Sequence, residues 1–245
     1  MNKTSSTSGP GFFLDGLRMI FNPALRWFVL LPLLINIGVF SGIVYWASRQ
    51  FSAWMDFLLG WLPEWLGFIE YALWPLFFLG IVAVVFFTFT VIGNLIASPF
   101  NALLSEKVQR MEGAELPDMA LKDWLVILPK SIGRELRKLQ YYLPRALILL
   151  ILSFIPLVNL VSPFLWFLFN GWMMAIQYCD YAADNRMMSF TDMMQRLRQN
   201  NPGVWAFGAT VSLVMLIPLV NLLIMPAAVV GSTLLWERRI QAGGQ

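Results

Sequence analysis

Four long runs without a charged residue divide the chain, at residues 27–48, 71–105, 146–179 and 204–236. The first run has 22 residues. As a helix it would extend about 33 Å, enough to cross a hydrocarbon core of ~30 Å once. The pattern therefore predicts a transmembrane helix over residues 27–48.

The second run is longer than one crossing needs, so we predict a long transmembrane helix over residues 71–112 that projects beyond the membrane. Residues 49–70 lie between the two helices and contain Trp54, Trp61 and Trp65. Tryptophan at this density is typical of the lipid headgroup region. The first two spans should therefore form a hairpin whose loop, residues 49–70, lies along the interface.

The hexapeptide IPLVNL occurs twice, at residues 155–160 and 217–222, inside the third and fourth uncharged runs. Before the first copy, residues 146–155 offer only about 15 Å of helix, which reaches about halfway through the membrane. Proline removes a backbone donor, so each copy predicts a break. We interpret residues 144–179 and 203–236 as two re-entrant hairpins that enter the membrane and leave on the same side.

The prolines that follow each break predict where the returning helices begin. These are Pro163 and Pro226, near the middle of the membrane. The N-terminus of a half-helix at that depth favours an anion. Asn159 and Asn221 lie at the two tips, and they either line an anion pathway or cap the freed backbone.

Two kinked helices that cross completely are the alternative to re-entrance. With re-entrant hairpins, 16 of the 17 Lys and Arg residues fall on one side, and only Arg49 lies on the other. With full crossings, Arg186, Arg196 and Arg198 move outside. The positive-inside rule therefore favours re-entrance, with both termini in the cytoplasm.

The polar segment between the second and third runs predicts a basic amphipathic helix over residues 117–143. Its leucine and isoleucine residues recur at helical spacing, whereas Lys130, Arg134, Arg137 and Lys138 share another face. Such a stripe either extends toward anionic lipid or forms an electropositive vestibule that concentrates anions. Just before this segment, Glu106 and Arg110 are four residues apart and should pair along a helix.

Composition agrees with an all-α integral membrane protein, a single membrane domain over residues 1–245. Hydrophobic residues make up 58% of the chain, charged residues 13%, and the mean hydropathy is +0.67. One cysteine and no histidine exclude an intrachain disulfide, a Cys/His metal site and a catalytic triad. We expect Cys179 to be a packing residue, and we expect neither a cofactor nor enzymatic activity.

Residues 11–26, GFFLDGLRMIFNPALR, form an N-terminal amphipathic segment. Gly16 lacks side-chain bulk and could expose backbone N–H groups. Arg18 carries a guanidinium group that is always charged and has several donors in one plane, which suits a tetrahedral oxyanion. An arginine at the membrane interface is the simpler interpretation of the same residues. If the segment binds an anion, Asp15 should point away from it.

Several segments resemble the CysZ family of bacterial sulfate permeases: FLDGLRMI, FVLLPLLIN, ASPFNALLSEKV, YYLPRA, FLWFLFNGWMMAIQYCDYAADN and IPLVNLLIMPAAVVG. The resemblance implies sulfate uptake across the bacterial inner membrane for cysteine synthesis. It also implies two long transmembrane helices with two partly inserted hairpins, assembled as homo-oligomers. Finally, it implies that Gly16, Leu17 and Arg18 bind sulfate.

A sulfate channel or ion-coupled permease is therefore the leading functional hypothesis, with sulfate and membrane lipids as partners and no nucleic acid. Its possible anion pathway includes Asn159, Asn221, Glu106, Arg110, Arg134 and Arg137. A membrane-embedded assembly or regulatory subunit without transport activity is the alternative. An enzyme acting on lipid would have only Asp180 and Asp184 as candidate acidic residues.

Overall fold

The computed structural model describes residues 8–61, 70–117, 123–217 and 221–242, and all of their regular secondary structure is helical. The all-α prediction is therefore confirmed for these residues. The chain divides into two units, one made of residues 28–100 and the other of residues 1–27 and 101–245.

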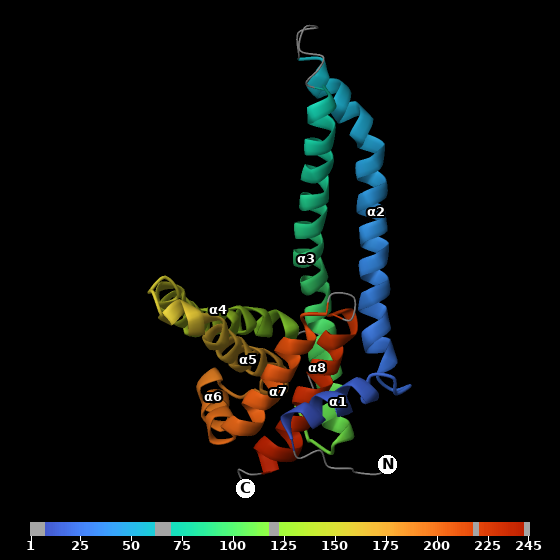
Figure 1. Ribbon diagram of the computed structural model, residues 1–245. Helices are drawn as coiled ribbons and strands as arrows, with labels where there is room; N and C mark the ends of the chain where they lie inside the picture. Colours follow the sequence, from blue (N-terminus) through green and yellow to red (C-terminus); the bar gives the residue numbers. More distant parts are fainter. Residues whose placement is uncertain (1–7, 62–69, 118–122, 218–220, 243–245) are drawn as a thin grey trace. The chain divides into compact units, whose positions relative to one another are not determined.

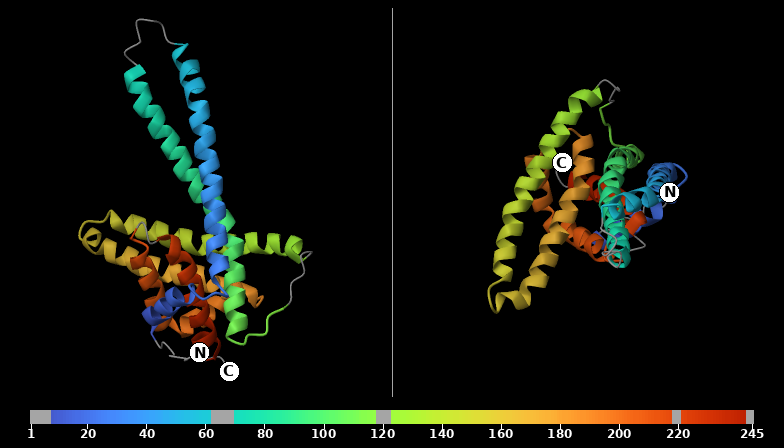
Figure 2. Two further views of the ribbon diagram at one scale, coloured as in Figure 1. Left: turned by 90° about the vertical axis from the view of Figure 1, so that its right-hand side faces the viewer. Right: turned by 90° about the horizontal axis from the view of Figure 1, so that it is seen from above.

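The unit of residues 28–100 holds most of α2 (Arg26–Leu59) and of α3 (Glu70–Met111). Within this unit the two helices run antiparallel (Figures 1 and 2). Residues 26–47 are long and apolar enough to cross a membrane. The helix predicted over residues 71–112 is present as α3 with nearly the same bounds.

The prediction that a loop begins at residue 49 is wrong, because α2 continues to Leu59. No proline or glycine occurs between Arg49 and Leu59, so nothing in this stretch ends a helix until Gly60. Trp65, and the loop that we predicted around it, lie outside the described residues.

The second unit begins with α1 (Gly9–Met19), whose first turn is capped by the Ser8 hydroxyl accepting a hydrogen bond from Gly11 N at 3.3 Å. It continues with α4 (Asp123–Ser153) and α5 (Val158–Asn185), which lie antiparallel (Figures 1 and 2). The predicted boundary near residue 143 is absent, because α4 continues through Pro144 into the apolar run.

The first copy of IPLVNL interrupts the helices, and the second lies where one helix has ended and the next begins, with residues 218–220 outside the described residues. The first break covers residues 154–157, and Leu157 adopts a positive φ of 73° just before α5. The second follows α7 (Asn201–Val214) and precedes α8 (Asn221–Leu235). Residues 158–185 form the second helix that is long and apolar enough to span a membrane.

The predicted starts of the returning helices are wrong. Pro163 and Pro226 lie inside α5 and α8, which begin at Val158 and Asn221. Both prolines occupy the sixth helical position, where a missing N–H removes only one hydrogen bond close to the end of the helix. The sequence correctly placed the breaks but not the residues that restart the helices.

A helix that we did not predict, α6 (Phe190–Gln199), connects α5 to α7. Ser189 caps it by accepting a hydrogen bond from Asp192 N at 3.1 Å, and its hydroxyl donates to the Asp192 carboxylate. The last element among the described residues is a π-helix, η3 (Trp236–Gln241), which directly follows α8.

Helices α1, α5, α7 and α8 pack together to form the core of this unit (Figure 1). Glycine makes the close crossings possible. A Cβ atom on Gly16 would stand 2.6 Å from Gly231 N in α8 and closer still to the carbonyl oxygen of Ala227. A Cβ atom on Gly208 would similarly meet the backbone of α5 at Gly171. Helices that approach at small residues are typical of membrane proteins.

Candidate functional site

The Gly16–Leu17–Arg18 stretch lies in the last turns of α1. Gly16 is buried against α8, Leu17 is half-buried, and the Arg18 side chain is 80% exposed. Gly16 lies in the interior of a helix, where N–H groups bond to carbonyl oxygens one turn earlier. The Arg18 guanidinium is therefore the group in this stretch that can reach an external anion.

Asp15 lies close to Arg18 in α1. Its Oδ1 lies 4.0 Å from Arg18 Nη1, and its other carboxylate oxygen is buried without a hydrogen-bond partner among the described residues. An anion that approaches Arg18 would therefore meet a guanidinium already partly neutralised by Asp15.

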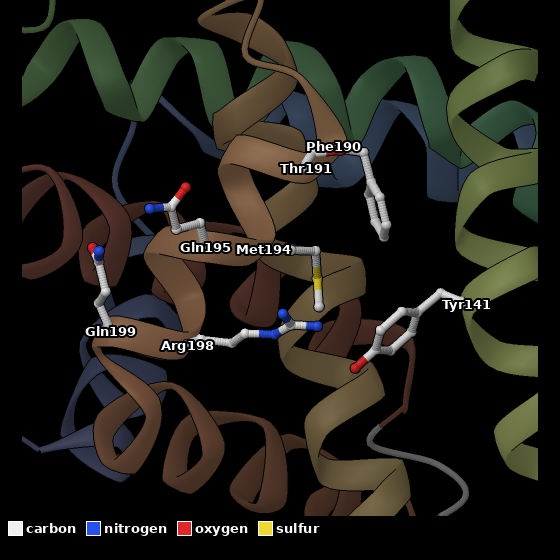
Figure 3. A pocket seen from close by; sticks show the side chains of 7 residues that line it. All are labelled: Tyr141, Phe190, Thr191, Met194, Gln195, Arg198 and Gln199. Carbon is white, nitrogen blue, oxygen red and sulfur yellow. The ribbon is translucent and has the colours of Figure 1, made fainter.

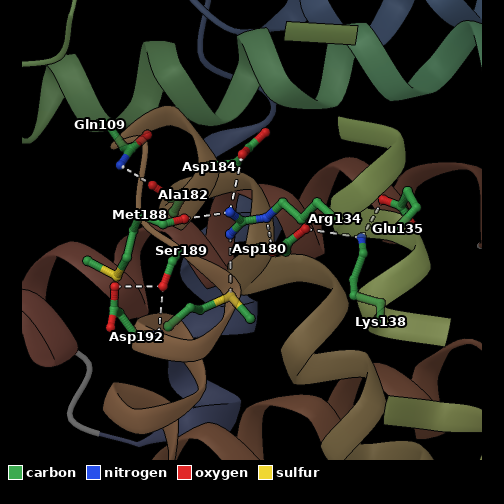
Figure 4. Close-up of polar contacts among 11 residues, drawn as sticks. Gln109, Arg134, Glu135, Lys138, Asp180, Ala182, Asp184, Met188, Ser189 and Asp192 are labelled. Carbon is green, nitrogen blue, oxygen red and sulfur yellow. Dashed lines mark hydrogen bonds and ion pairs between the residues drawn. The ribbon is translucent and has the colours of Figure 1, made fainter. Parts of the chain in front are cut away.

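Arg134 of the predicted basic stripe faces inward and is neutralised by acidic residues of α5 (Figure 4). Its Nε donates to Asp180 at 2.6 Å, and Nη1 lies 3.3 Å from Asp184. Only 10% of the Arg134 side chain and 8% of that of Asp180 are exposed. The same guanidinium donates to the carbonyl oxygen of Met188, which lies between α5 and α6. Arg134 therefore links α4 both to α5 and to the connection that follows it.

Lys138 belongs to the same cluster, one turn later on α4. Its ammonium lies 3.1 Å from Asp180, pairs with Glu135 and bonds to Gln177 at 3.3 Å. Burial would lower the pKa of Lys138, but the Asp180 and Glu135 carboxylates outweigh burial and raise it. Lys138 is therefore charged at neutral pH and compensates Asp180.

The four predicted stripe residues thus differ in environment. Arg134 and Lys138 are buried and paired, whereas Arg137 is exposed. The Lys130 side chain lies outside the described residues. A continuous electropositive face built from all four residues is not what the described part of the chain presents.

A second buried polar network surrounds the junction of α3, α5 and η3. The Gln109 amide donates to Glu237 at 2.7 Å and to the carbonyl oxygen of Ala182 at 3.0 Å, and it accepts from Asn185. The Arg186 guanidinium donates two hydrogen bonds to the Glu237 carboxylate, one to each oxygen. The sequence did not predict this network, because its partners are far apart along the chain. Arg186 and Glu237 are 51 residues apart, and Gln109 and Glu237 are 128 residues apart.

The Glu106–Arg110 pair predicted from the four-residue spacing is confirmed, with Arg110 Nε 2.9 Å from Glu106. It is partly exposed, with 39% of the Arg110 side chain and 26% of that of Glu106 accessible. The pair lies on the last turns of α3, within the unit of residues 101–245.

Asn159 is exposed in the first turn of α5, and no side chain caps that turn in the described structure. Its amide is therefore available to a ligand, and the interpretation that it caps freed backbone finds no support. Asn221 is the first residue of α8, and its side chain lies outside the described residues.

Near the first break, Ser153 of α4 forms a hydrogen bond with Ser162 of α5 and accepts another from Trp166 Nε1 at 3.2 Å. These bonds hold the ends of α4 and α5 together.

Comparison with known proteins gives the family. Residues 12–226 match the family described as Sulfate transporter CysZ/Etoposide-induced protein 2.4. The chain belongs to this family.

Curated members of the CysZ family named "Sulfate transporter CysZ" align over almost all of the chain. The protein of Pseudomonas paraeruginosa (strain PA7) is 50% identical over 233 residues, covering 94% of this chain and 95% of its own. That of Pectobacterium atrosepticum is 45% identical over 234 residues, covering 95% of this chain and 85% of its own. The resemblance found in the sequence is thus confirmed, and the family match includes Gly16–Arg18 and both IPLVNL segments.

Proposed function

We propose that this protein carries sulfate across the bacterial inner membrane, as a channel or ion-coupled permease that supplies sulfur for cysteine biosynthesis. The observation that carries the proposal is the identity of about half of all residues, over nearly the full length, with proteins named as sulfate transporters. Two helices with the length and hydropathy of membrane spans agree with it. Uptake of labelled sulfate by vesicles that contain only this protein is the experiment that tests it.

Within this proposal, sulfate binds at Gly16, Leu17 and Arg18. Sulfate only accepts hydrogen bonds, so a site for it needs donors. The exposed Arg18 guanidinium supplies them, while Gly16 holds α1 close to α8 and so fixes the direction from which Arg18 projects. The proposed role of Gly16 is thus packing rather than donation of its own N–H group.

The proposed anion pathway includes Glu106, Arg110, Asn159, Asn221 and Arg137. Asn159 and Arg137 are exposed, and the Glu106–Arg110 pair is partly exposed, so these groups are accessible to an ion. Arg134 would support the wall of the pathway rather than contact the ion, because Asp180, Asp184 and the carbonyl oxygen of Met188 already occupy its guanidinium.

A lipid-modifying enzyme is the least supported of the three functional hypotheses. Its only candidate acids, Asp180 and Asp184, are both within ion-pair distance of Arg134. Asp180 is buried and already paired with both Arg134 and Lys138, so it is not accessible to a substrate. The relatives are named as transporters, which also argues against this alternative.

We further propose that both broken segments are re-entrant, that both termini are cytoplasmic and that the protein forms homo-oligomers. The hairpin model predicts that the α5–α6 connection faces the cytoplasm. Met187 is suitable for testing this because it is 53% exposed, whereas Ala183 is fully buried. With buried Cys179 replaced by alanine, a cysteine at Met187 should react with an impermeant maleimide from the cytoplasmic face only.

Gln199, exposed at the end of α6, serves as the matched reference on the same side. A Met187→Cys variant that is labelled from the periplasm would contradict re-entrance and favour two complete crossings.

A further inference from the structure

A pocket of about 590 Å³ lies between α4 and α6 (Figure 3), and its lining includes neither Gly16–Arg18 nor Arg134, Lys138, Asp180 or Asp184. This volume is typical of small-molecule sites. Phe190, Met194 and Arg198 occur at four-residue intervals on α6, so they share one helix face. All three side chains extend toward Tyr141 of α4 (Figure 3).

The pocket has an apolar floor and a cationic edge. Tyr141 and Phe190 meet edge to face with ring centroids 6.3 Å apart, and Met194 is buried beside them. Arg198 is exposed, and no carboxylate in the described structure lies within ion-pair distance of it. None of the residues that line the pocket is acidic.

A second guanidinium lies against the Tyr141 ring. Arg145 is centred 3.7 Å from the ring centroid and donates to the Tyr141 carbonyl oxygen at 2.7 Å. The Tyr141 hydroxyl is fixed in turn by Trp172 Nε1 at 3.1 Å. The aromatic wall is therefore held in place, and Arg198 lies at its edge, so the pocket is complementary to an anion that has an apolar part. Arg145 stabilises the Tyr141 ring and is not one of the residues that line the pocket.

The position of the pocket along α4 identifies that anion. Arg145 is the last charged residue before the uncharged run 146–179. Immediately after it, Leu147, Ile148, Leu150 and Ile151 are each 46–58% exposed. Tyr141, Arg145 and Ile148 follow at intervals of four and three residues, so the pocket leads directly onto this apolar surface. Tyrosine and tryptophan beside the boundary are typical of the headgroup level of a membrane.

We propose that this pocket binds an anionic phospholipid, with the lipid phosphate at Arg198 and the acyl chains along the exposed apolar side chains of α4. The proposal rests on the proposed insertion of the α4–α5 hairpin in the membrane. It does not require that the protein transports sulfate. Basic pockets between membrane helices on the cytoplasmic side are sites of this kind.

The test is native mass spectrometry of the purified full-length protein. The protein is mixed with equal amounts of phosphatidylglycerol and phosphatidylcholine that carry identical acyl chains. The parent should retain phosphatidylglycerol preferentially. Arg198→Gln should lower the ratio of bound phosphatidylglycerol to phosphatidylcholine about fivefold, because a basic residue near a charged membrane surface contributes about that factor.

Lys107→Gln is the matched control, because it removes one positive charge from an exposed position on α3 outside the pocket. Its ratio should equal that of the parent. An unchanged ratio in Arg198→Gln, or an equal fall in Lys107→Gln, would overturn the proposal.

Inorganic phosphate distinguishes a lipid from a free oxyanion. If millimolar phosphate displaces phosphatidylglycerol more strongly than sodium chloride of the same ionic strength, the pocket is a site for free oxyanions and the lipid proposal fails. Sulfate flux is measured separately. A parent protein that prefers phosphatidylglycerol but moves no sulfate would keep the lipid site and refute the proposed function.

Discussion

Replacing Asp180 by asparagine should lower the free energy of unfolding by about 3–5 kcal/mol, because it leaves two buried cations without their main partner. Asp180 lies 2.6 Å from Arg134 and 3.1 Å from Lys138, and both cations are at least 90% buried as side chains. The remaining acids, Asp184 and Glu135, are 46% and 65% exposed and compensate less well. The midpoint of thermal unfolding should fall by roughly 6–20 °C.

Asp192→Asn is the control for this prediction. Asp192 is an exposed carboxylate in the first turn of α6, and Ser189 is its partner. The same substitution there should cost only about 0.3–1 kcal/mol. The two variants can be compared by thermal unfolding in detergent, and similar losses in both would show that the Arg134 cluster does not hold α4 against α5.

Arg18→Ala should weaken sulfate binding by roughly 10- to 150-fold, the equivalent of a charge-assisted hydrogen bond of about 1.5–3 kcal/mol. Stability should not change, because the Arg18 side chain is 80% exposed. Arg18→Lys keeps the charge but loses the planar fork, so its affinity should lie between those of the parent and the alanine variant. Isothermal titration with sulfate measures all three affinities.

Gly16→Ala should lower stability and also weaken sulfate binding, because Gly16 fixes the direction from which Arg18 projects. A Cβ atom there would overlap the backbone of α8, so α1 must move and thermal stability should fall. Asp15→Asn removes the carboxylate 4.0 Å from Arg18 and should strengthen sulfate binding. If Arg18→Ala binds sulfate as tightly as the parent, the site lies elsewhere, and Asn159 and Asn221 become the better candidates.

The sequence predicted the features that depend on local patterns. The length of α3 follows from an unbroken apolar run, and the first break, at residues 154–157, contains the proline of IPLVNL. The Glu106–Arg110 pair follows from spacing along one helix. A local signal for α6 is also present, since Ser189 and Asp192 have the spacing of a helix cap.

Features that depend on distant residues could not be predicted. Arg134 lies on the basic stripe of an amphipathic helix, and only the fold brings it to Asp180, 46 residues later. Gly16 suggested an exposed backbone, yet the structure fills the space beside it with α8. The pocket beside Tyr141 was equally hidden, because Arg198 reaches it from α6, a helix absent from the sequence prediction.

Transport of sulfate by the protein alone is the central claim, and flux into sealed vesicles tests it most directly. Purified protein is reconstituted, and entry of radiolabelled sulfate is compared with that into empty vesicles, with and without a pH gradient. Entry should exceed that of empty vesicles without ATP, because the sequence contains no phosphate-binding loop of the Walker type, and Arg18→Ala should reduce it. If folded parent protein gives no entry above empty vesicles under either condition, the account is contradicted, and an assembly or regulatory subunit is the better description.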